Sequence, residues 1–279
     1  ISYFNSKIKY PNIKIILIIR KTFDKKIYNK NIQIINKDFT KIKNFPECDF
    51  ILYCLRTNSI KEDATLFKIF KNKIMKLKKK PKIIYTSSGV LYGLNKKKIK
   101  INEKFKIIKK FKKSDMYKYK WFSQKLYLER KFFDLSKDNY ETIVLRMFSF
   151  IGPNILNQNY TVSQFYESIK NNKKITINGP INTFRSYLDE IDTVEWILKI
   201  FFNFKKRDFQ IYNFGCDKPI RIYDLLRKML GKKHVNKIKS FNKSNQLDYY
   251  VPSIKKLKKE FNLTKRISLD KSIKKLYLK

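Results

Sequence analysis

The segment "KIIYTSSG" at residues 82–89 decides how this chain folds, because a run of apolar and β-branched residues leads into small polar residues and a glycine. A run of this length and composition predicts a β-strand. Amphipathic segments at 62–78 and 114–136 lie before and after it, and their periodicity predicts helices. The middle of the chain is therefore expected to hold a strand between two helices.

Runs of the same kind recur through the first half, at residues 12–20, 31–39, 48–55 and 141–150. Strands that alternate with helices indicate a parallel sheet covered on both faces. We therefore expect an α/β fold, a Rossmann-like doubly wound parallel sheet. In such sheets ligands collect beyond the carboxyl ends of the strands, so the residues that follow each strand are the ones to inspect.

The second half mixes helical patterns with short strands. Helices are predicted at 161–171, 192–203 and 221–230, and strands at "KITING" and "FQIYNFG". No repeat and no low-complexity linker separates the two halves. We place a boundary near residue 150, between a part at 1–150 and a smaller α/β part at 151–279.

The charge is strongly basic, with 65 Lys and Arg against 23 Asp and Glu and a formal net charge of +42. Such a charge ordinarily suggests a polyanionic partner. The lysines are spread over the whole chain, as in "NKNIQIINK" and "KNKIMKLKKK", and not gathered into one arm. We interpret them as a solvated surface, so binding to nucleic acid is expected to be at most non-specific.

The composition argues against metal centres and membrane spans. Cys48, Cys54 and Cys216 are far apart and His234 is the only histidine, so we expect no metal site. The longest apolar runs, "IILII" and "FILYCL", fall far short of the ~20 residues that a bilayer span needs. Because no signal-peptide pattern occurs, we expect a cytoplasmic, reducing location.

Six segments are informative together because of their order along the chain. They are "IIYTSSGVLYG", the helix with Lys125 and Glu129, "LRMFSFIGP", "TFRSYLDEID", "IYNFGCDKPIRIYDLL" and "YYVPSIKKLKKEFNL". In this order they resemble the NAD-dependent epimerase/dehydratase family, the extended short-chain dehydrogenases/reductases that act on nucleotide sugars. The resemblance runs the length of the chain. It implies a dinucleotide-binding domain at 1–150 and a substrate-binding region at 151–279.

The resemblance implies that a serine holds a sugar hydroxyl, a tyrosinate takes its proton, and a lysine follows four residues later on the same helix face. Ser88 and Lys125 match the serine and the lysine. The lysine would lower the tyrosine pKa from its usual value of about 10. The tyrosine position holds Trp121, whose indole N–H only donates and does not ionise in this range. Trp121 therefore cannot serve as general base, which puts standard catalysis in doubt.

Two nearby tyrosines are candidates to replace it. Tyr119 lies roughly 200° around the helix from Trp121, at about 100° per residue, and faces the wrong way. Tyr117 shares the face but lies about 6 Å along the axis, and a displacement of ~1 Å can already cost a hundredfold in rate. Tyr117 stays as the candidate for rescue. The alternative is that the aromatic residues of this helix only pack.

The glycine-rich phosphate loop of the family does not occur in this sequence. Since the chain also begins with Ile1, we expect a fragment that lacks the first strand and this loop. Arg20 weakly indicates the 2′-phosphate of NADP, whereas NAD is the family default. By resemblance Asp38 contacts the adenine, with a turn-forming role as the alternative, and Phe148 joins Lys125 as a cofactor contact.

The expected substrate contacts also come from the resemblance. Arg185 in "TFRSYLDEID" matches an arginine that grips the diphosphate of a nucleotide sugar, a task that suits a planar guanidinium. Tyr92 and Ser149 are the other predicted contacts, and Ser149 stands where many relatives have asparagine. Asp192, seven residues after Arg185, is predicted to cap the next helix.

Two functions stay open. The first is a nucleotide-sugar epimerase, dehydratase or reductase that uses NAD or NADP and serves polysaccharide synthesis. The second is a non-catalytic member of the same fold that binds dinucleotide or RNA as a scaffold, which Trp121 and the charge of +42 both fit. The resemblance also allows a homodimer. Whether this chain is an active enzyme, and on which sugar, does not follow from the sequence.

Overall fold

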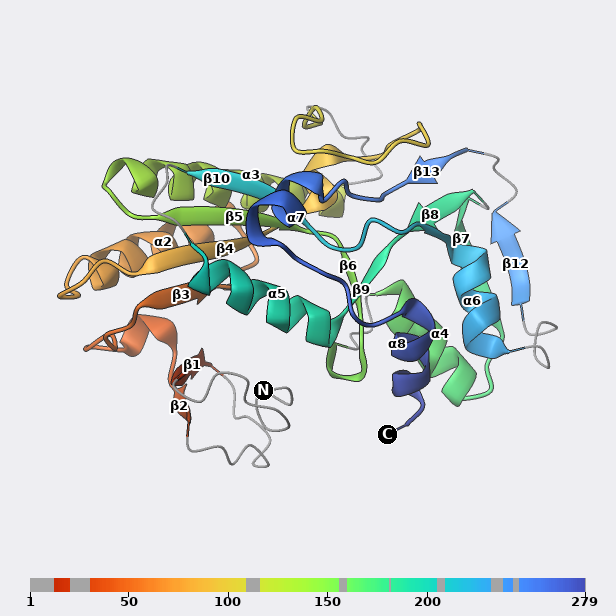
Figure 1. The fold of residues 1–279 in the computed structure, drawn as a ribbon, viewed down its shortest axis with the longest axis horizontal. Coiled ribbons are helices and arrows are strands. Elements are labelled where there is room, and N and C mark those ends of the chain that lie inside the picture. Colours follow the sequence, from red (N-terminus) through yellow and green to blue (C-terminus); the bar gives the residue numbers. More distant parts are fainter. Residues whose placement is uncertain are drawn as a thin grey trace. The chain divides into compact units, whose positions relative to one another are not determined.

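The computed structural model describes residues 13–20, 31–108, 116–155, 160–180, 182–204, 209–231, 238–242 and 246–278, with the backbone alone for 116–118, 178–179 and 238–242. The chain divides into two compact units, Ile1–Asp49 with Arg56–Pro81, and Phe50–Leu55 with Lys82–Lys279 (Figure 1). The boundary that we predicted near residue 150 remains a prediction.

The first unit contains a parallel pair of strands and a capped helix. Its elements are β1 (Ile15–Ile19), β2 (Ile32–Asn36), the short 3-10 helix η1 (Phe39–Lys41) and α2 (Ile60–Ile74). Ser59 begins α2 by accepting a hydrogen bond from the Glu62 backbone N–H, and the Glu62 carboxylate accepts one from the Asn58 N–H. This reciprocal pairing satisfies backbone donors that a helix start otherwise leaves open.

The second unit is built on a sheet of four parallel strands in the order β10-β5-β4-β3. The strands are β3 (Phe50–Tyr53), β4 (Lys82–Ser88), β5 (Thr142–Met147) and β10 (Gln210–Phe214). The predicted α/β, Rossmann-like fold with a parallel sheet is confirmed. Strand β10 comes from the second half of the chain and pairs with β5, so the sheet includes a segment beyond residue 150.

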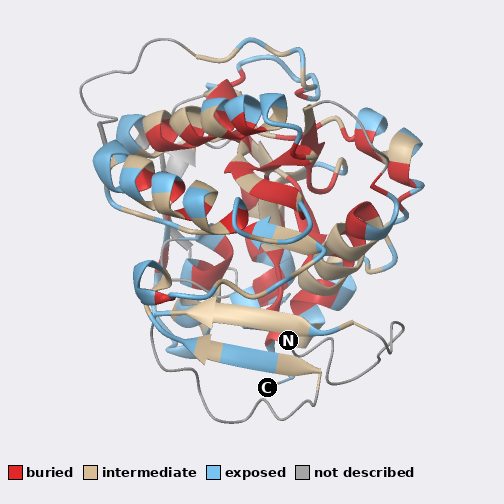
Figure 2. Ribbon diagram, turned by 90° about the vertical axis from the view of Figure 1, so that its left-hand side faces the viewer, coloured by how far each residue is buried: buried red, intermediate tan, exposed pale blue. Residues whose placement is uncertain are grey.

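Helices cover both faces of this sheet. Successive residues of a strand point to opposite faces, so neighbouring residues of β4 contact different helices. Tyr85 stacks on Phe132 of α3 (Met116–Lys137), with ring centres 4.7 Å apart. Ile84, the preceding residue, packs in one cluster with Trp196 and Ile200 of α5 (Glu190–Phe202). Figure 1 shows α3 and α5 on opposite sides of the strands, and Figure 2 shows helices that are buried along one side and exposed along the other.

The remaining elements of this unit lie outside the four-stranded sheet, and several of them form a second core at its far end. They are β6 (Ser149–Ile151), η4 (Pro153–Ile155), α4 (Thr161–Lys170), β7 (Ile175–Pro180), β8 (Thr183–Arg185), β9 (Tyr187–Asp189), β11 (Ile220–Arg221), α6 (Ile222–Leu230), β12 (Ile238–Asn242), β13 (Asp248–Tyr249), α7 (Lys255–Phe261) and α8 (Leu269–Leu276). Apolar residues of α4, α6, α8 and β7, such as Phe165, Leu225 and Ile273, pack together there.

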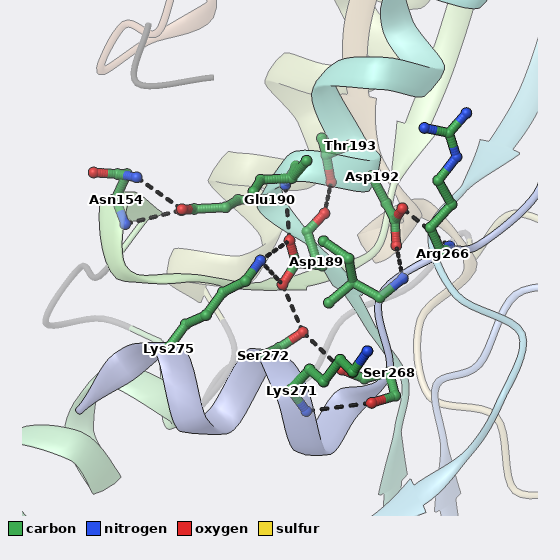
Figure 3. A network of polar contacts seen from close by, with 12 residues as sticks. Asn154, Asp189, Glu190, Asp192, Thr193, Arg266, Ser268, Lys271, Ser272 and Lys275 are labelled. Atoms are coloured by element: carbon green, nitrogen blue, oxygen red, sulfur yellow. Dashed lines mark hydrogen bonds and ion pairs between the residues drawn. The ribbon is translucent and has the colours of Figure 1, made fainter. Parts of the chain in front are cut away.

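A buried carboxylate ties the end of the chain to this core (Figure 3). Asp189 is fully buried and accepts hydrogen bonds from the Ile191 N–H, the Ser272 hydroxyl and the Lys275 ammonium. Asp189 is therefore the N-cap of α5. The prediction that Asp192 caps this helix is wrong, because Asp192 lies within the first turn. It accepts instead from two backbone N–H groups, at residues 266 and 267.

Candidate functional site

Strand β4 ends in two serines, and because neighbouring strand residues point to opposite sides, they face different surroundings. Ser87 is buried and donates a hydrogen bond of 2.6 Å to Glu129 of α3. Ser88 is half-buried and begins the 3-10 helix η2 (Gly89–Tyr92), accepting from the Val90 N–H at 3.2 Å. Of the two hydroxyls, that of Ser88 is therefore the more accessible at the carboxyl edge of the sheet.

Helix α3 brings Lys125 and Trp121 to the same edge. The Lys125 ammonium donates a hydrogen bond of 2.8 Å to the carbonyl of Thr86, two residues before Ser88. It lies 5.0 Å from the ring centre of Trp121 and 5.1 Å from that of Tyr85. Such cation–π contacts favour the charged lysine. The indole therefore holds the ammonium in place but has no proton to exchange with it.

A buried polar network fixes the position of α3. Arg146 of β5 donates to both carboxylate oxygens of Glu129, at 2.9 and 2.7 Å, and to the Tyr92 hydroxyl at 2.9 Å. Tyr92 in turn donates to Asn213 at 2.7 Å. Burial by itself would lower the pKa of Arg146, but the bonds and the charge of Glu129 outweigh it and raise the pKa. Because Glu129 lies one turn after Lys125, this network sets where the lysine stands.

Tyr92 is one of the predicted substrate contacts, and the structure places it in the interior. Its side chain is 1% exposed, and its hydroxyl bonds to Asn213 and Arg146 in the network just described. Burial raises the pKa of Tyr92, so it stays a neutral phenol. Its contact with substrate stays a prediction.

Arg185 lies at the end of β8 and is engaged within the protein. Its guanidinium donates to the Asp248 carboxylate at 2.6 Å and to the Phe184 carbonyl at 2.8 Å. A quarter of the side chain remains exposed. A diphosphate would therefore meet an arginine whose charge Asp248 already balances. Ser149, the third predicted substrate contact, is half-buried at the start of β6, opposite Tyr187.

The sequence patterns do not single out Tyr250, which follows β13. Its ring centre lies 4.5 Å from that of Phe148, the predicted cofactor contact. A Cβ atom on Gly89 would lie 2.6 Å from the Tyr250 hydroxyl oxygen, so this phenol stands directly beside the residue that follows Ser88. The segment "YYVPSIKK" resembles the family, but more than 150 residues separate it from Ser88, and no local pattern reports such a contact.

The predicted adenine and ribose contacts lie in the first unit. Asp38 is the N-cap of η1 and accepts from the backbone and the hydroxyl of Thr40, at 2.9 and 2.7 Å. These hydrogen bonds lower its pKa. This is the geometry of a turn-forming aspartate, the alternative role that the sequence left open. Arg20 is exposed just after β1, and the Tyr117 side chain lies outside the described residues.

The residues present fit one end of a nicotinamide dinucleotide. Lys125, Ser88 and Phe148 offer a cation, a hydroxyl and an aromatic surface at the carboxyl edge of the sheet, where such ligands bind. For the pyrophosphate the sequence offers no glycine cradle, since its first glycine is Gly89. Among the described residues no cluster of His, Cys, Asp or Glu could hold a metal ion.

No helix in the described ranges combines the length and the apolar character that crossing a bilayer requires.

Comparisons with known proteins agree with this fold. The sequence matches the model of the NAD dependent epimerase/dehydratase family over residues 59–215, more than half of the chain. No curated protein matches it.

Three solved structures have the same fold. A dTDP-glucose 4,6-dehydratase from Bacillus anthracis, in complex with NAD, is 17% identical, with a TM-score of 0.75 over 99% of this chain and 89% of that one. A UDP-glucose 4-epimerase from Thermotoga maritima, with UDP-glucose, is also 17% identical, with a TM-score of 0.74 over 99% and 93%. A UDP-glucuronic acid 4-epimerase from Bacillus cereus, in complex with UDP-glucuronic acid and NAD, is 18% identical, with a TM-score of 0.68 over 89% and 81%.

Proposed function

The chain belongs to the NAD-dependent epimerase/dehydratase family, and we propose that it is a nucleotide-sugar oxidoreductase of the epimerase or dehydratase type. One observation carries the proposal. The Lys125 ammonium is held near the end of β4 by the carbonyl of Thr86, two residues before Ser88 in the chain. The helix that carries Lys125 is fixed to the sheet by the buried Glu129–Arg146 ion pair. A fold kept only as a scaffold has no need for a lysine placed so closely.

Each residue has a part in this proposal. A nicotinamide bound at this edge of the sheet would supply hydride transfer from and back to a sugar carbon. Ser88 holds the sugar hydroxyl by a hydrogen bond, and Lys125 holds the cofactor ribose. Phe148 provides the apolar surface beside them. Arg185 binds the diphosphate when Asp248 releases it, because a guanidinium binds phosphate in bidentate fashion.

The finer assignments are part of the same proposal. NAD is the family default and Arg20 weakly favours NADP. A cytoplasmic role in polysaccharide synthesis fits the free thiols of Cys48, Cys54 and Cys216. A homodimer is the assembly we would test first.

A non-catalytic scaffold remains the second candidate, and Trp121 favours it. The indole that lies over Lys125 has replaced the group that moves the proton in the family's mechanism. In that case the chain binds dinucleotide or RNA and turns over no sugar.

The two are separated by incubation with UDP-glucose, dTDP-glucose and UDP-glucuronic acid at millimolar NAD or NADP, with products identified by NMR. We expect a changed sugar from at least one of them. Lys125→Met should reduce the rate at least about a hundredfold, because an oriented charged group is lost. Lys131→Met is the matched control, since Lys131 also lies over an aromatic ring of α3 but near the surface. No product from any sugar would favour the scaffold.

A further inference from the structure

We propose that Tyr250 is the catalytic phenol of this protein and exchanges the proton that Trp121 cannot. The inference rests on the proposed function and supplies the one group it leaves unassigned. The observation behind it is the position of the Tyr250 hydroxyl, which lies beside Gly89, the residue that follows Ser88 at the carboxyl end of β4.

The chain is built to admit this phenol. A Cβ atom at Gly89 would lie 2.6 Å from the Tyr250 oxygen and 2.7 Å from the Phe148 ring, closer than real Cβ contacts come. Any other residue at position 89 would therefore displace the tyrosine or the phenylalanine. The glycine after Ser88 thus leaves space for a side chain that arrives from the far end of the sequence.

The backbone on both sides of Tyr250 is anchored. Its N–H donates to the Phe184 carbonyl at 3.1 Å, and the carbonyl of Val251, the next residue, accepts from Ile101 at 2.9 Å. Val251 is fully buried. The ring packs against Phe148 at 4.5 Å between centres. A side chain held at this many points can keep a hydroxyl within the narrow tolerance that proton transfer requires.

The surroundings decide which form of Tyr250 is present. Burial raises its pKa, and the charge of Arg185 and the nearby Ser88 hydroxyl offset part of that rise. The hydroxyl of Tyr92 and the carboxylate of Asp248 act in the raising direction. At neutral pH the residue is therefore a phenol, ready to give a proton. Arg185, whose guanidinium carbon lies 5.4 Å from the ring centre, favours the phenolate that forms.

The step can be written for a ketosugar. Its carbonyl carbon gains the hydride that the reduced nicotinamide loses, and the carbonyl oxygen takes the proton of Tyr250 while Ser88 donates a hydrogen bond to it. The products are an alcohol, an oxidised nicotinamide and a phenolate, which regains a proton from water. In the oxidising direction the phenolate takes the proton of the sugar hydroxyl as the carbon loses hydride. The phenol thus does the work of a general acid and base.

The competing explanation is that Tyr250 only fills space against Phe148. Tyr250→Phe separates the two, since it keeps the ring and removes the oxygen. Tyr249→Phe is the matched control, because Tyr249 precedes it in the chain and packs its ring on Phe184 at 5.6 Å. Both variants should keep the thermal stability of the wild type within a few degrees, which melting curves would verify.

We would measure turnover of the three nucleotide sugars and, independently, the 19F NMR signal of 3-fluorotyrosine at position 250 or 249. We expect Tyr250→Phe to lower kcat by about 10²- to 10⁴-fold, the usual range for general acid–base groups, with little change in KM. Tyr249→Phe should stay within twofold. Ser88→Ala and added UDP-glucose should each shift the fluorine signal at position 250 and leave that at 249 in place.

Each failure has its own meaning. Unchanged kcat in Tyr250→Phe, with an active wild type, overturns the role of Tyr250 and leaves the proposed function standing. If the fluorine chemical shift at position 250 changes neither in Ser88→Ala nor on addition of UDP-glucose, the placement of the phenol is contradicted, whatever the activity. A wild type that converts none of the sugars contradicts the proposed function, and the catalytic role of Tyr250 with it.

Discussion

The ammonium of Lys125 lies 5.0 Å above the ring of Trp121, the residue one helical turn before it. In the family's catalytic helix the corresponding position is a tyrosine, which the lysine activates. Here the same spacing produces a cation–π contact, which holds the lysine but transfers no proton. If the chain is the proposed oxidoreductase, its proton therefore moves through a group from elsewhere in the chain.

The first prediction concerns this exchange of roles. If Tyr250 supplies the phenol, adding Trp121→Tyr to Tyr250→Phe should raise kcat at least about tenfold above that of Tyr250→Phe alone. The reason is that it puts a phenol back beside Lys125. Trp121→Phe in the same background should restore nothing. Steady-state rates on the best nucleotide sugar provide the comparison. Tyr117→Phe should leave the wild-type rate unchanged, and a large loss there would make Tyr117 the working base instead.

The second prediction concerns the diphosphate. Asp248→Asn should tighten the binding of UDP roughly fivefold, equivalent to about 1 kcal/mol, because it removes a carboxylate that occupies Arg185 and repels the ligand. Asp217→Asn removes a comparable part-buried partner, of Lys258, and serves as the control. Isothermal titration with UDP measures both. Equal or weaker binding in Asp248→Asn would mean that Asp248 orients Arg185 and does not block it.

The third prediction concerns the buried ion pair. Glu129→Gln should lower the free energy of unfolding by about 3–5 kcal/mol, because it leaves Arg146 buried without its counter-charge. Asp134→Asn, on the exposed side of the same helix, should change it by less than about 1 kcal/mol. Urea denaturation followed by circular dichroism would measure both values. Similar losses in the two variants would show that the network adds no more than a surface pair.

The fourth prediction concerns the C-terminal helix. Asp189→Asn keeps an acceptor for the Ile191 N–H but loses the charge that holds Lys275, and it should cost about 1–3 kcal/mol. Hydrogen exchange should rise first in α8. The control is Asp270→Asn, which removes an exposed carboxylate that pairs with Lys228. Uniform exchange changes across the second unit would contradict a local anchoring role.

The fifth prediction tests the scaffold alternative. If the charge of +42 is a solvated surface, the affinity for short single-stranded RNA should fall steeply with salt and should not depend on sequence. Fluorescence anisotropy with two RNAs of unrelated sequence, at rising salt, would measure this. A sequence preference that survives high salt would strengthen the scaffold function.

Periodicity and local spacing were sufficient for the strands of the main parallel sheet, for the longer helices and for one part of the site. The strand predicted at 82–89 is β4 (Lys82–Ser88), and the helix predicted at 114–136 is α3 (Met116–Lys137). Because a helix or strand buries one face, its apolar residues recur at a fixed spacing in the sequence, and this spacing can be recognised without the structure. The i, i+4 relation of Trp121 and Lys125 is equally local, so the helical pattern alone places the two side chains on one face, where they meet.

Contacts between distant segments were decided by the tertiary structure alone. Asp189, and not Asp192, begins α5, and its remaining lone pairs are taken by a helix near the end of the chain. The position of Tyr250 beside Gly89 and Ser88 depends on β13 pairing with β8, which no short pattern encodes. Local sequence determines whether a segment becomes a helix or a strand, whereas packing of the whole core determines which strands pair and which side chains meet at the edge of the sheet.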